Sequence, residues 1–296
     1  MAAGPIRQSL GSSVLHRGAK AARSMLWTNP LWVNRWLGNV RSNRVWQRAL
    51  VRFGHARGWV HPRNFVLLCA ARSGTTMLVD YLNCHPQVRC RGEILGEGHQ
   101  GYGSPFSMDR TRLALHVQSL FVKRPGILVG AKILTYHLDE LPVKSGDLAQ
   151  LLDRPKVVVL YRAQILEQFV SLKLAERDGL WHSRRPAKNQ PIRLDPATFL
   201  AYAARERRMW RESLAGFGDC QLHYVTYDDL TTQAEQTMQG VFQFLGLEAC
   251  PVQARFGRLR PHPLAEKLLN YQDYLQPDIL PHTVLERPVA DAAEPA

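Results

Sequence analysis

The start of the sequence lacks acidic residues, and the whole chain is poor in cysteine. No Asp or Glu precedes Asp80, whereas twelve of the 38 Lys and Arg residues do. The rest of the chain carries 26 basic and 25 acidic residues, so 12 of the 13 net positive charges lie in the N-terminal part before Asp80. The five cysteines form no C-x-x-C pair, which argues against a disulfide framework or a zinc site and favours a reducing compartment.

Long apolar runs are also missing. No stretch approaches the roughly 18 residues that a membrane-spanning helix needs, and no apolar core of a signal peptide is visible. We therefore expect no membrane anchor and a cytoplasmic protein, either free or peripheral to a membrane. The first 25 residues are rich in Ser and Arg, which leaves an organelle-targeting sequence open.

Residues 1–62 are basic and rich in tryptophan, and we expect them to form an extension to the main domain. Over residues 25–60, apolar and Arg positions recur at roughly helical spacing. Such helices either pack on their own domain or lie on an anionic membrane surface. Nucleic-acid binding is the weaker hypothesis, because the Arg residues are scattered and no recognition motif follows. We assign residues 63–280 to the main domain and residues 281–296 to a C-terminal tail.

The most informative stretch begins with an apolar run, residues 65–69, that is short enough for a buried strand. A turn of small residues follows, and then the apolar positions take on helical spacing. The first turn of a helix presents N–H groups that can bind an anion. Arg72 adds a forked positive charge, and Gly74 permits close approach of the backbone. We predict that an anionic ligand is held by Arg72, Ser73, Gly74, Thr75 and Thr76.

This loop differs from the loop of nucleoside triphosphatases. Against the pattern G-x-x-x-x-G-K-[ST], Cys69 replaces the first glycine and Thr75 replaces the lysine, so that only Gly74 and Thr76 agree. The lysine and hydroxyl of that pattern serve a magnesium-bound triphosphate. We therefore expect a phosphate-like ligand without a metal ion, and a kinase-like phosphotransferase is the alternative.

A second strand and helix follow further along the chain. Residues 156–161 predict a buried strand, Arg162 stands at its end, and Ser171 lies on the next helix. A dianionic phosphate suits the forked donors of an arginine, and a hydroxyl group can complete its set of partners. Between the two units, Lys132 lies inside another apolar run, residues 127–134. A charged side chain in a buried strand usually serves a site or pairs with a carboxylate.

These residues together resemble a known family. Arg-Ser-Gly-Thr-Thr-Met-Leu after a buried strand is similar to the 5'-phosphosulfate loop of sulfotransferases that use 3'-phosphoadenosine 5'-phosphosulfate (PAPS). Arg162 and Ser171 resemble the pair that binds the 3'-phosphate of PAPS in that family. The separation of nine residues between them and the sequence Gln-x-Val-Ser-Leu resemble the nodulation-factor type of sulfotransferase. The resemblance covers about residues 63–277 and implies an α/β, P-loop-like fold of three layers, with a mostly parallel sheet and helices on both faces.

The resemblance also implies catalytic residues. In the nodulation-factor and trehalose types, a glutamate in a context similar to Gly92-Glu93 is the general base, which implies that role for Glu93. Similar enzymes often show Gly-x-Lys at the position of Lys132, our second catalytic candidate, and His99 and His137 are reserve bases. The implied reaction moves a sulfuryl group from PAPS to a hydroxyl of a glycan, glycolipid or other small acceptor. A non-catalytic nucleotide-binding protein at a membrane is a further alternative.

Loops supply the remaining expectations. Residues 96–101 match G-x-G-x-x-G but lack the strand and helix of a dinucleotide site, so we interpret residues 96–108 as an acceptor loop. Residues 178–196 are long and basic, typical of a lid or acceptor loop or of a plain surface excursion. Residues 255–260 resemble a late basic loop that reaches the nucleotide. Residues 227–230, Tyr-Asp-Asp-Leu, resemble a family segment that we assign to the fold and not to the chemistry.

Overall fold

The computed structural model describes the main domain and a short piece before it. The described residues are 47–49, 51–52, 64–96, 105, 108–122, 126–181, 190–253, 262–276 and 279. Most of the N-terminal extension, the C-terminal tail, residues 255–260 and large parts of both expected acceptor loops lie outside them. Within the described ranges, no helix is long and apolar enough to cross a membrane.

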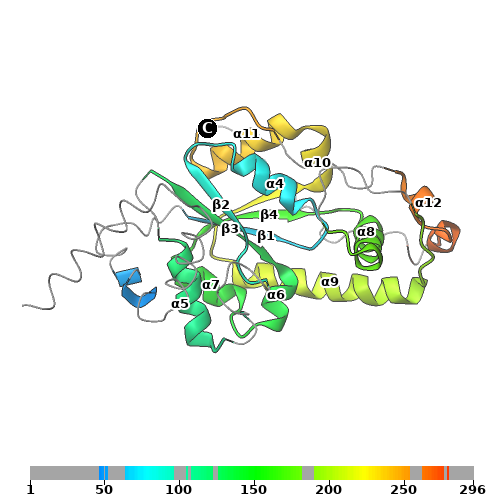
Figure 1. Ribbon diagram of the computed structural model, residues 1–296, viewed down its shortest axis with the longest axis horizontal. Coiled ribbons are helices and arrows are strands. Elements are labelled where there is room, and N and C mark those ends of the chain that lie inside the picture. The colour runs from blue at the N-terminus through cyan, green and yellow to red at the C-terminus, as the bar shows by residue number, and fades with distance from the viewer. Residues whose placement is uncertain are drawn as a thin grey trace, which may run out of the picture.

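Five strands form one sheet in the order β2-β3-β1-β4-β5 (Figure 1). The strands are β1 (Phe65–Cys69), β2 (Val88–Glu93), β3 (Leu128–Leu134), β4 (Lys156–Tyr161) and β5 (Leu222–Thr226). β1 is central, because it pairs with β3 on one side and with β4 on the other. All four pairings are parallel, so the carboxyl ends of the strands meet at one edge, where open α/β sheets bind ligands.

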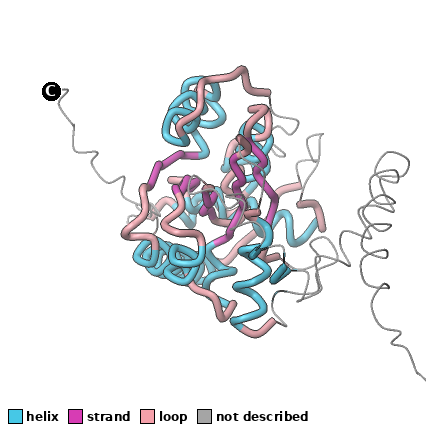
Figure 2. Tube along the Cα trace, turned by 90° about the vertical axis from the view of Figure 1, so that its left-hand side faces the viewer, coloured by secondary structure: helices cyan, strands magenta, loops and turns pink. Residues whose placement is uncertain are grey.

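Helices cover both faces of this sheet. They are α4 (Thr75–Leu82), α5 (Arg110–Leu120), α6 (Thr135–Glu140), α7 (Ser145–Leu151), α8 (Ile165–Asp178), α9 (Pro196–Gly216), α10 (Tyr227–Thr232), α11 (Ala234–Leu245) and α12 (Leu264–Lys267), with a 3-10 turn η2 (Tyr271–Tyr274). Figure 1 places α4, α10 and α11 on one side of the strands and α5, α6, α7 and α9 on the other. In the perpendicular view of Figure 2, the strands again lie between helical groups.

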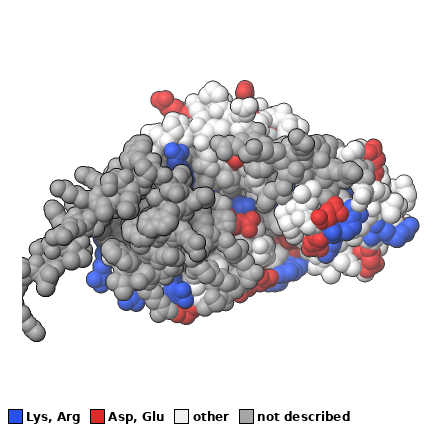
Figure 3. Space-filling model, in the orientation of Figure 1, with Lys and Arg blue, Asp and Glu red and all other residues white. Residues whose placement is uncertain are grey.

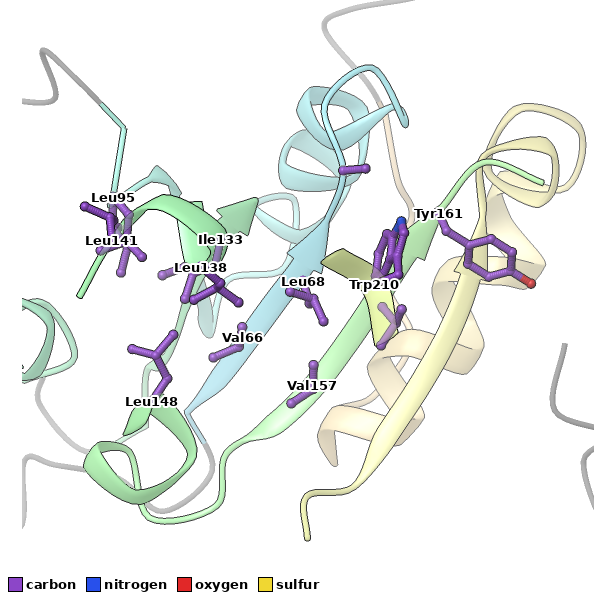
Figure 4. Packing of buried hydrophobic residues seen from close by; sticks show 14 of the residues in the cluster. Val66, Leu68, Leu95, Ile133, Leu138, Leu141, Leu148, Val157, Tyr161 and Trp210 are labelled. Atoms are coloured by element: carbon purple, nitrogen blue, oxygen red, sulfur yellow. The ribbon is translucent and has the colours of Figure 1, made fainter. Parts of the chain in front are cut away.

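The central strand shows why the chain forms three layers. All five residues of β1 are fully buried, as expected for a parallel strand covered on both faces. Val66 and Leu68 pack in one apolar cluster with Trp210 of α9, whereas Phe65 and Leu67 belong to the cluster on the opposite face. Figure 4 shows the first of these clusters, with Val66 and Leu68 pointing to the same side. The predicted three-layer α/β fold is therefore confirmed.

Two elements depend on contacts between residues that are distant in sequence. The second strand extends to Glu93, because its backbone continues to pair with β3 through an irregularity between Arg91 and Glu93. A short helix, α6, follows β3 directly. Ion pairs from Arg205 and Arg208 of α9 to Asp139 hold it against the domain, and such tertiary contacts are invisible in a local pattern.

The described surface carries no large field of one sign on the face shown in Figure 3. Basic and acidic side chains lie close together there, over α9 and the elements beside it. This agrees with the near balance of charges beyond the N-terminal quarter.

Candidate active site

The first anion-binding element is the connection from β1 to α4, residues 70–74. Arg72 and Gly74 both have left-handed backbone conformations, with φ of 63° and 87°. A Cβ atom on Gly74 would lie 2.6 Å from Cδ2 of Tyr227, so conformation and neighbour both require glycine. Gly74 is the N-cap of α4, and neither a capping side chain nor an acidic residue occupies the first turn. The first N–H groups of α4 are therefore well suited to bind an anion.

The three hydroxyl groups of this element differ in what they can reach. Ser73 is fully buried, and its Oγ donates to the Ala70 carbonyl oxygen at 2.7 Å. In this arrangement Ser73 would bind a ligand through its backbone N–H and not through its hydroxyl. Thr75 Oγ1 accepts a hydrogen bond from Lys132 Nζ at 3.3 Å, so the hydroxyl proton of Thr75 can still be donated. Thr76, one residue on, is partly exposed.

Arg72 connects the two predicted binding elements. Its Nε donates to Ser171 Oγ on α8 at 3.2 Å, and its Nη1 donates to the carbonyl oxygen of Trp181 at 2.8 Å. A positive φ is uncommon for a residue with a side chain, and such strain clusters at functional sites. Here the conformation turns the guanidinium toward α8. Arg72 and Ser171, which the sequence assigns to opposite ends of the ligand, are therefore direct neighbours.

Glu93 and Lys132 form an ion pair at the carboxyl edge of the sheet. The two residues are register partners across β2 and β3, and Lys132 Nζ lies 2.7 Å from Glu93 Oε1. Lys132 is buried, whereas 28% of the Glu93 side chain is exposed. The same Nζ donates to Thr75 at the start of α4. One ammonium group therefore joins the predicted base to the predicted anion loop, and the Glu93 side chain stays partly exposed.

His137 lies beside this pair but is fully buried. Its Nδ1 accepts a hydrogen bond from the backbone N–H of Leu134 at 3.4 Å. Burial lowers the pKa of His137 to about 4, with a raising influence from Glu93 and a lowering one from Lys132. A neutral, enclosed imidazole is less accessible to an acceptor than Glu93. The other reserve base, His99, lies outside the described residues.

Arg162 stands at the carboxyl end of β4 and is nine-tenths buried. It forms an ion pair with Glu167 in the first turn of α8, and its guanidinium lies 4.3 Å from the centre of the Tyr227 ring. Its Nε is buried and has no hydrogen-bond partner in the described part of the chain. A buried donor without a partner costs free energy, and a bound anion would remove that cost.

Tyr227 is the site residue that the sequence analysis missed. Its ring packs against Gly74, in the loop after β1, and also against the guanidinium of Arg162, which follows β4. Tyr227 therefore links the two predicted binding elements. Tyr227 follows β5 directly, and β5 pairs with β4, which ends one residue before Arg162. The sequence shows that Tyr227 stands at the end of a predicted strand. The local sequence does not show that this strand pairs with β4, and this pairing brings Tyr227 to Arg162.

The structure thus gathers the predicted residues at one edge of the sheet. Glu93, Lys132 and Thr75 form one connected group, and Arg72 with Ser171 forms a second. Arg162 joins the first loop through Tyr227 and Gly74. Among the described residues, no three His, Cys, Asp or Glu side chains are grouped so that they could hold a metal ion.

Comparisons with known proteins show what this chain is similar to. The model of the sulfotransferase family matches residues 132–251, which include Lys132, Arg162 and Ser171. Nodulation protein H of Rhizobium tropici is 28% identical over 218 residues, which cover 71% of this chain and 87% of that protein. Nodulation protein H of Rhizobium meliloti is 25% identical over 229 residues, covering 72% of this chain and 90% of that protein.

Among solved structures, a sulfotransferase from Alicyclobacillus acidocaldarius shares 17% identity with a TM-score of 0.44, covering 67% of this chain and 86% of that chain. The family model and the curated relatives agree with the resemblance seen in the two binding motifs. The chain is therefore similar to the sulfotransferase family over residues 132–251 and to nodulation protein H over 71–72% of its length.

Proposed function

We propose that this protein transfers a sulfuryl group from PAPS to a hydroxyl group of an acceptor, with Glu93 as general base. The observation that carries the proposal is the position of Lys132, whose ammonium contacts both Glu93 and Thr75. A proton acceptor and an anion-binding loop are thereby joined by one positive charge. This is the arrangement that transfer of an anionic group to an oxygen nucleophile requires.

The residues present fit a doubly phosphorylated nucleotide. The N-terminal N–H groups of α4, with Arg72, Gly74, Thr75 and Thr76, would hold the 5'-phosphosulfate. Arg162 and Ser171 would hold the 3'-phosphate, and the unsatisfied buried Nε of Arg162 supports a ligand at that place. The donors are N–H groups, hydroxyl groups and guanidinium groups, which suit phosphate oxygens without a metal ion.

Bound PAPS would supply the sulfuryl group, whose bond to the 5'-phosphate oxygen breaks as the acceptor oxygen bonds to sulfur. Glu93 takes the proton that the acceptor hydroxyl loses, since its carboxylate is partly exposed and Lys132 Nζ lies 2.7 Å from one of its oxygens. Lys132 places its positive charge beside the loop, where negative charge collects on the departing phosphate. Ser73 keeps the loop in shape through its bond to Ala70. The products are a sulfate ester and adenosine 3',5'-bisphosphate (PAP).

The acceptor that we favour is a glycan or glycolipid. The support is the resemblance of the Gly92-Glu93 context and of the Arg162-to-Ser171 spacing to carbohydrate-acting types. Trp181, whose side chain is 45% exposed, lies beside this site through its carbonyl contact with Arg72. Residues 96–108 and 178–196 would complete the acceptor site. A cytoplasmic location, with residues 25–60 touching an anionic membrane, completes the proposal.

An acceptor screen with radiolabelled PAPS tests this function. Wild-type protein should transfer label to at least one hydroxyl-bearing sugar or lipid, and Glu93→Gln should lower turnover by about 10²–10⁴-fold. PAP binding, measured by calorimetry, should persist in that variant, because Glu93 does not hold the nucleotide. Full activity of Glu93→Gln would place the base elsewhere. Tight binding of ATP with Mg²⁺ and none of PAP would favour a phosphotransferase instead.

A further inference from the structure

Arg162 already has an anionic partner, to which the proposed mechanism gives no role. Its Nη2 forms an ion pair with the carboxylate of Glu167, five residues further along the chain. Only 10% of the Arg162 side chain is exposed, against 33% for Glu167. A buried charge is tolerated when it is paired, so Glu167 stabilises Arg162 while no ligand is present.

Two further contacts fix the direction of the guanidinium. The Tyr227 ring covers one of its faces, with 4.3 Å between the guanidinium carbon and the ring centre. The ion pair with Glu167 occupies one end of the fork. The Nε of Arg162 is left buried and unsatisfied among the described residues. Nε is therefore a buried polar atom of Arg162 that a ligand would satisfy.

We propose that Glu167 is a positioning residue that orients Arg162 and also weakens the binding of a 3'-phosphate. The inference rests on the proposed function, because it assumes that Arg162 holds that phosphate. Glu167 keeps the guanidinium in its binding orientation through the hydrogen bond that it accepts. The same carboxylate offsets part of the positive charge that the phosphate would meet.

The consequence is easier release of product. The donor and its product PAP both carry a 3'-phosphate, so a site that binds this group too strongly would retain PAP after each turnover. The Glu167 carboxylate and the 3'-phosphate would both contact the guanidinium of Arg162, so the two negative groups would repel each other. This repulsion is poorly screened because Arg162 is buried. Glu167 therefore lowers the affinity for the 3'-phosphate and speeds the release of PAP. It affects only nucleotides that have a 3'-phosphate.

This selectivity makes the test specific. Dissociation constants of PAP and of AMP, which lacks the 3'-phosphate, are measured by calorimetry for wild-type protein and for Glu167→Gln. Glutamine keeps an oxygen that accepts from Arg162 but removes the charge. We expect Glu167→Gln to bind PAP about tenfold more tightly, a change of about 1.4 kcal/mol, and to bind AMP as the wild type does. An equal change for both nucleotides, or none, overturns the proposal.

Two more variants separate charge from orientation. Glu167→Ala removes the hydrogen-bond acceptor as well as the charge, and it should bind PAP at least about threefold more weakly than Glu167→Gln. Equal affinities of the two variants would overturn the positioning role. Glu176→Gln is the matched control, since Glu176 lies on the same helix and pairs with Lys173 at the surface. It should leave both dissociation constants unchanged, and an effect as large as that of Glu167→Gln would overturn the local account.

The outcomes also distinguish this inference from the proposed function. If the wild type binds PAP more tightly than AMP, and Glu167→Gln has the same two dissociation constants, only the role of Glu167 is contradicted. Wild-type protein without any preference for PAP contradicts both.

Discussion

Arg72 Nε donates a hydrogen bond to Ser171 Oγ at 3.2 Å, across 99 residues of sequence. The contact joins the loop after β1 to the helix after β4, the two elements that carry the binding motifs. These strands are neighbours in the sheet, so their carboxyl ends open at the same place. A side chain from one motif can therefore complete the site of the other.

The first prediction concerns this contact. Arg72→Ala and Ser171→Ala should each weaken PAP binding, and their effects should be coupled by about 1 kcal/mol in a double-mutant cycle. The coupling arises because each variant removes the same hydrogen bond. The cycle between Arg72→Ala and Lys173→Ala is the control, since Lys173 pairs with Glu176. Additive effects in both cycles would show that the contact does not contribute.

A second prediction follows from the crowding at Gly74. Gly74→Ala should destabilise the protein by more than the roughly 1–2 kcal/mol of a left-handed alanine, because its Cβ would lie 2.6 Å from Tyr227. It should also weaken PAP binding by moving Tyr227 from Arg162. Gly179→Ala is the matched control, with φ of 63° and no atom within 4 Å of the added Cβ. Thermal unfolding and calorimetry check both, and equal losses of stability would contradict the crowding.

A third prediction uses the buried imidazole of His137. Its pKa is lowered to about 4, chiefly by burial, while the unfolded chain titrates near the usual histidine value of 6.5. The native state thus binds fewer protons below pH 6.5, and stability falls as the pH drops from about 6.5 toward 4. At pH 5 the loss should be about 2 kcal/mol relative to pH 7.5.

Urea unfolding of wild type and His137→Gln at both pH values measures this loss. The free energy of unfolding of the wild type should fall at pH 5, whereas that of His137→Gln should not, because the variant lacks the imidazole. The difference in unfolding free energy between the two proteins should therefore shrink by the loss predicted for the wild type. His262→Gln, at an exposed site, is the control and should follow the wild type. Parallel pH profiles of wild type and His137→Gln would contradict the assignment.

The fourth prediction has the opposite sign. Burial raises the pKa of Glu206 on α9 to about 7, with Gln168 and Tyr202 as its hydrogen-bond partners. A raised carboxyl pKa stabilises the fold below the unfolded value and loses that contribution as the pH rises through 7. Glu206→Gln should therefore be more stable than wild type at pH 8 by about 1–3 kcal/mol and nearly equal to it at pH 5.

Chemical unfolding at the two pH values checks the Glu206 prediction. Glu212→Gln, which removes an exposed carboxylate on the same helix, should show no such gain. A Glu206→Gln protein that is less stable than wild type at pH 8 would show that the carboxylate is needed in its charged form.

Local patterns were enough to predict a mostly parallel sheet and the strand ends at which the candidate site residues lie. The strands before Arg72 and Arg162 are buried apolar runs, and each is followed by a helix, so both arginines had to lie at strand ends. The buried charge of Lys132 required a carboxylate partner or a ligand, and the structure supplies Glu93. These inferences needed only residues that are close in sequence.

What could not be predicted depends on strand order and packing. The pairing of Glu93 with Lys132 exists because β2 lies beside β3, and the contact of Tyr227 with Arg162 exists because β5 lies beside β4. The turn of Ser73 toward Ala70 and the partnership of Glu167 with Arg162 are side-chain choices that the fold decides. A motif names the residues of such a site, but it does not say which of them touch.

The most direct test of the central claim is a crystal structure of the protein with PAP. The account predicts a single PAP molecule whose 5'-phosphate lies at the N-terminus of α4 and whose 3'-phosphate accepts hydrogen bonds from Arg162. A structure in which Arg162 and the loop of Arg72 face separate cavities, with no nucleotide spanning them, would contradict it.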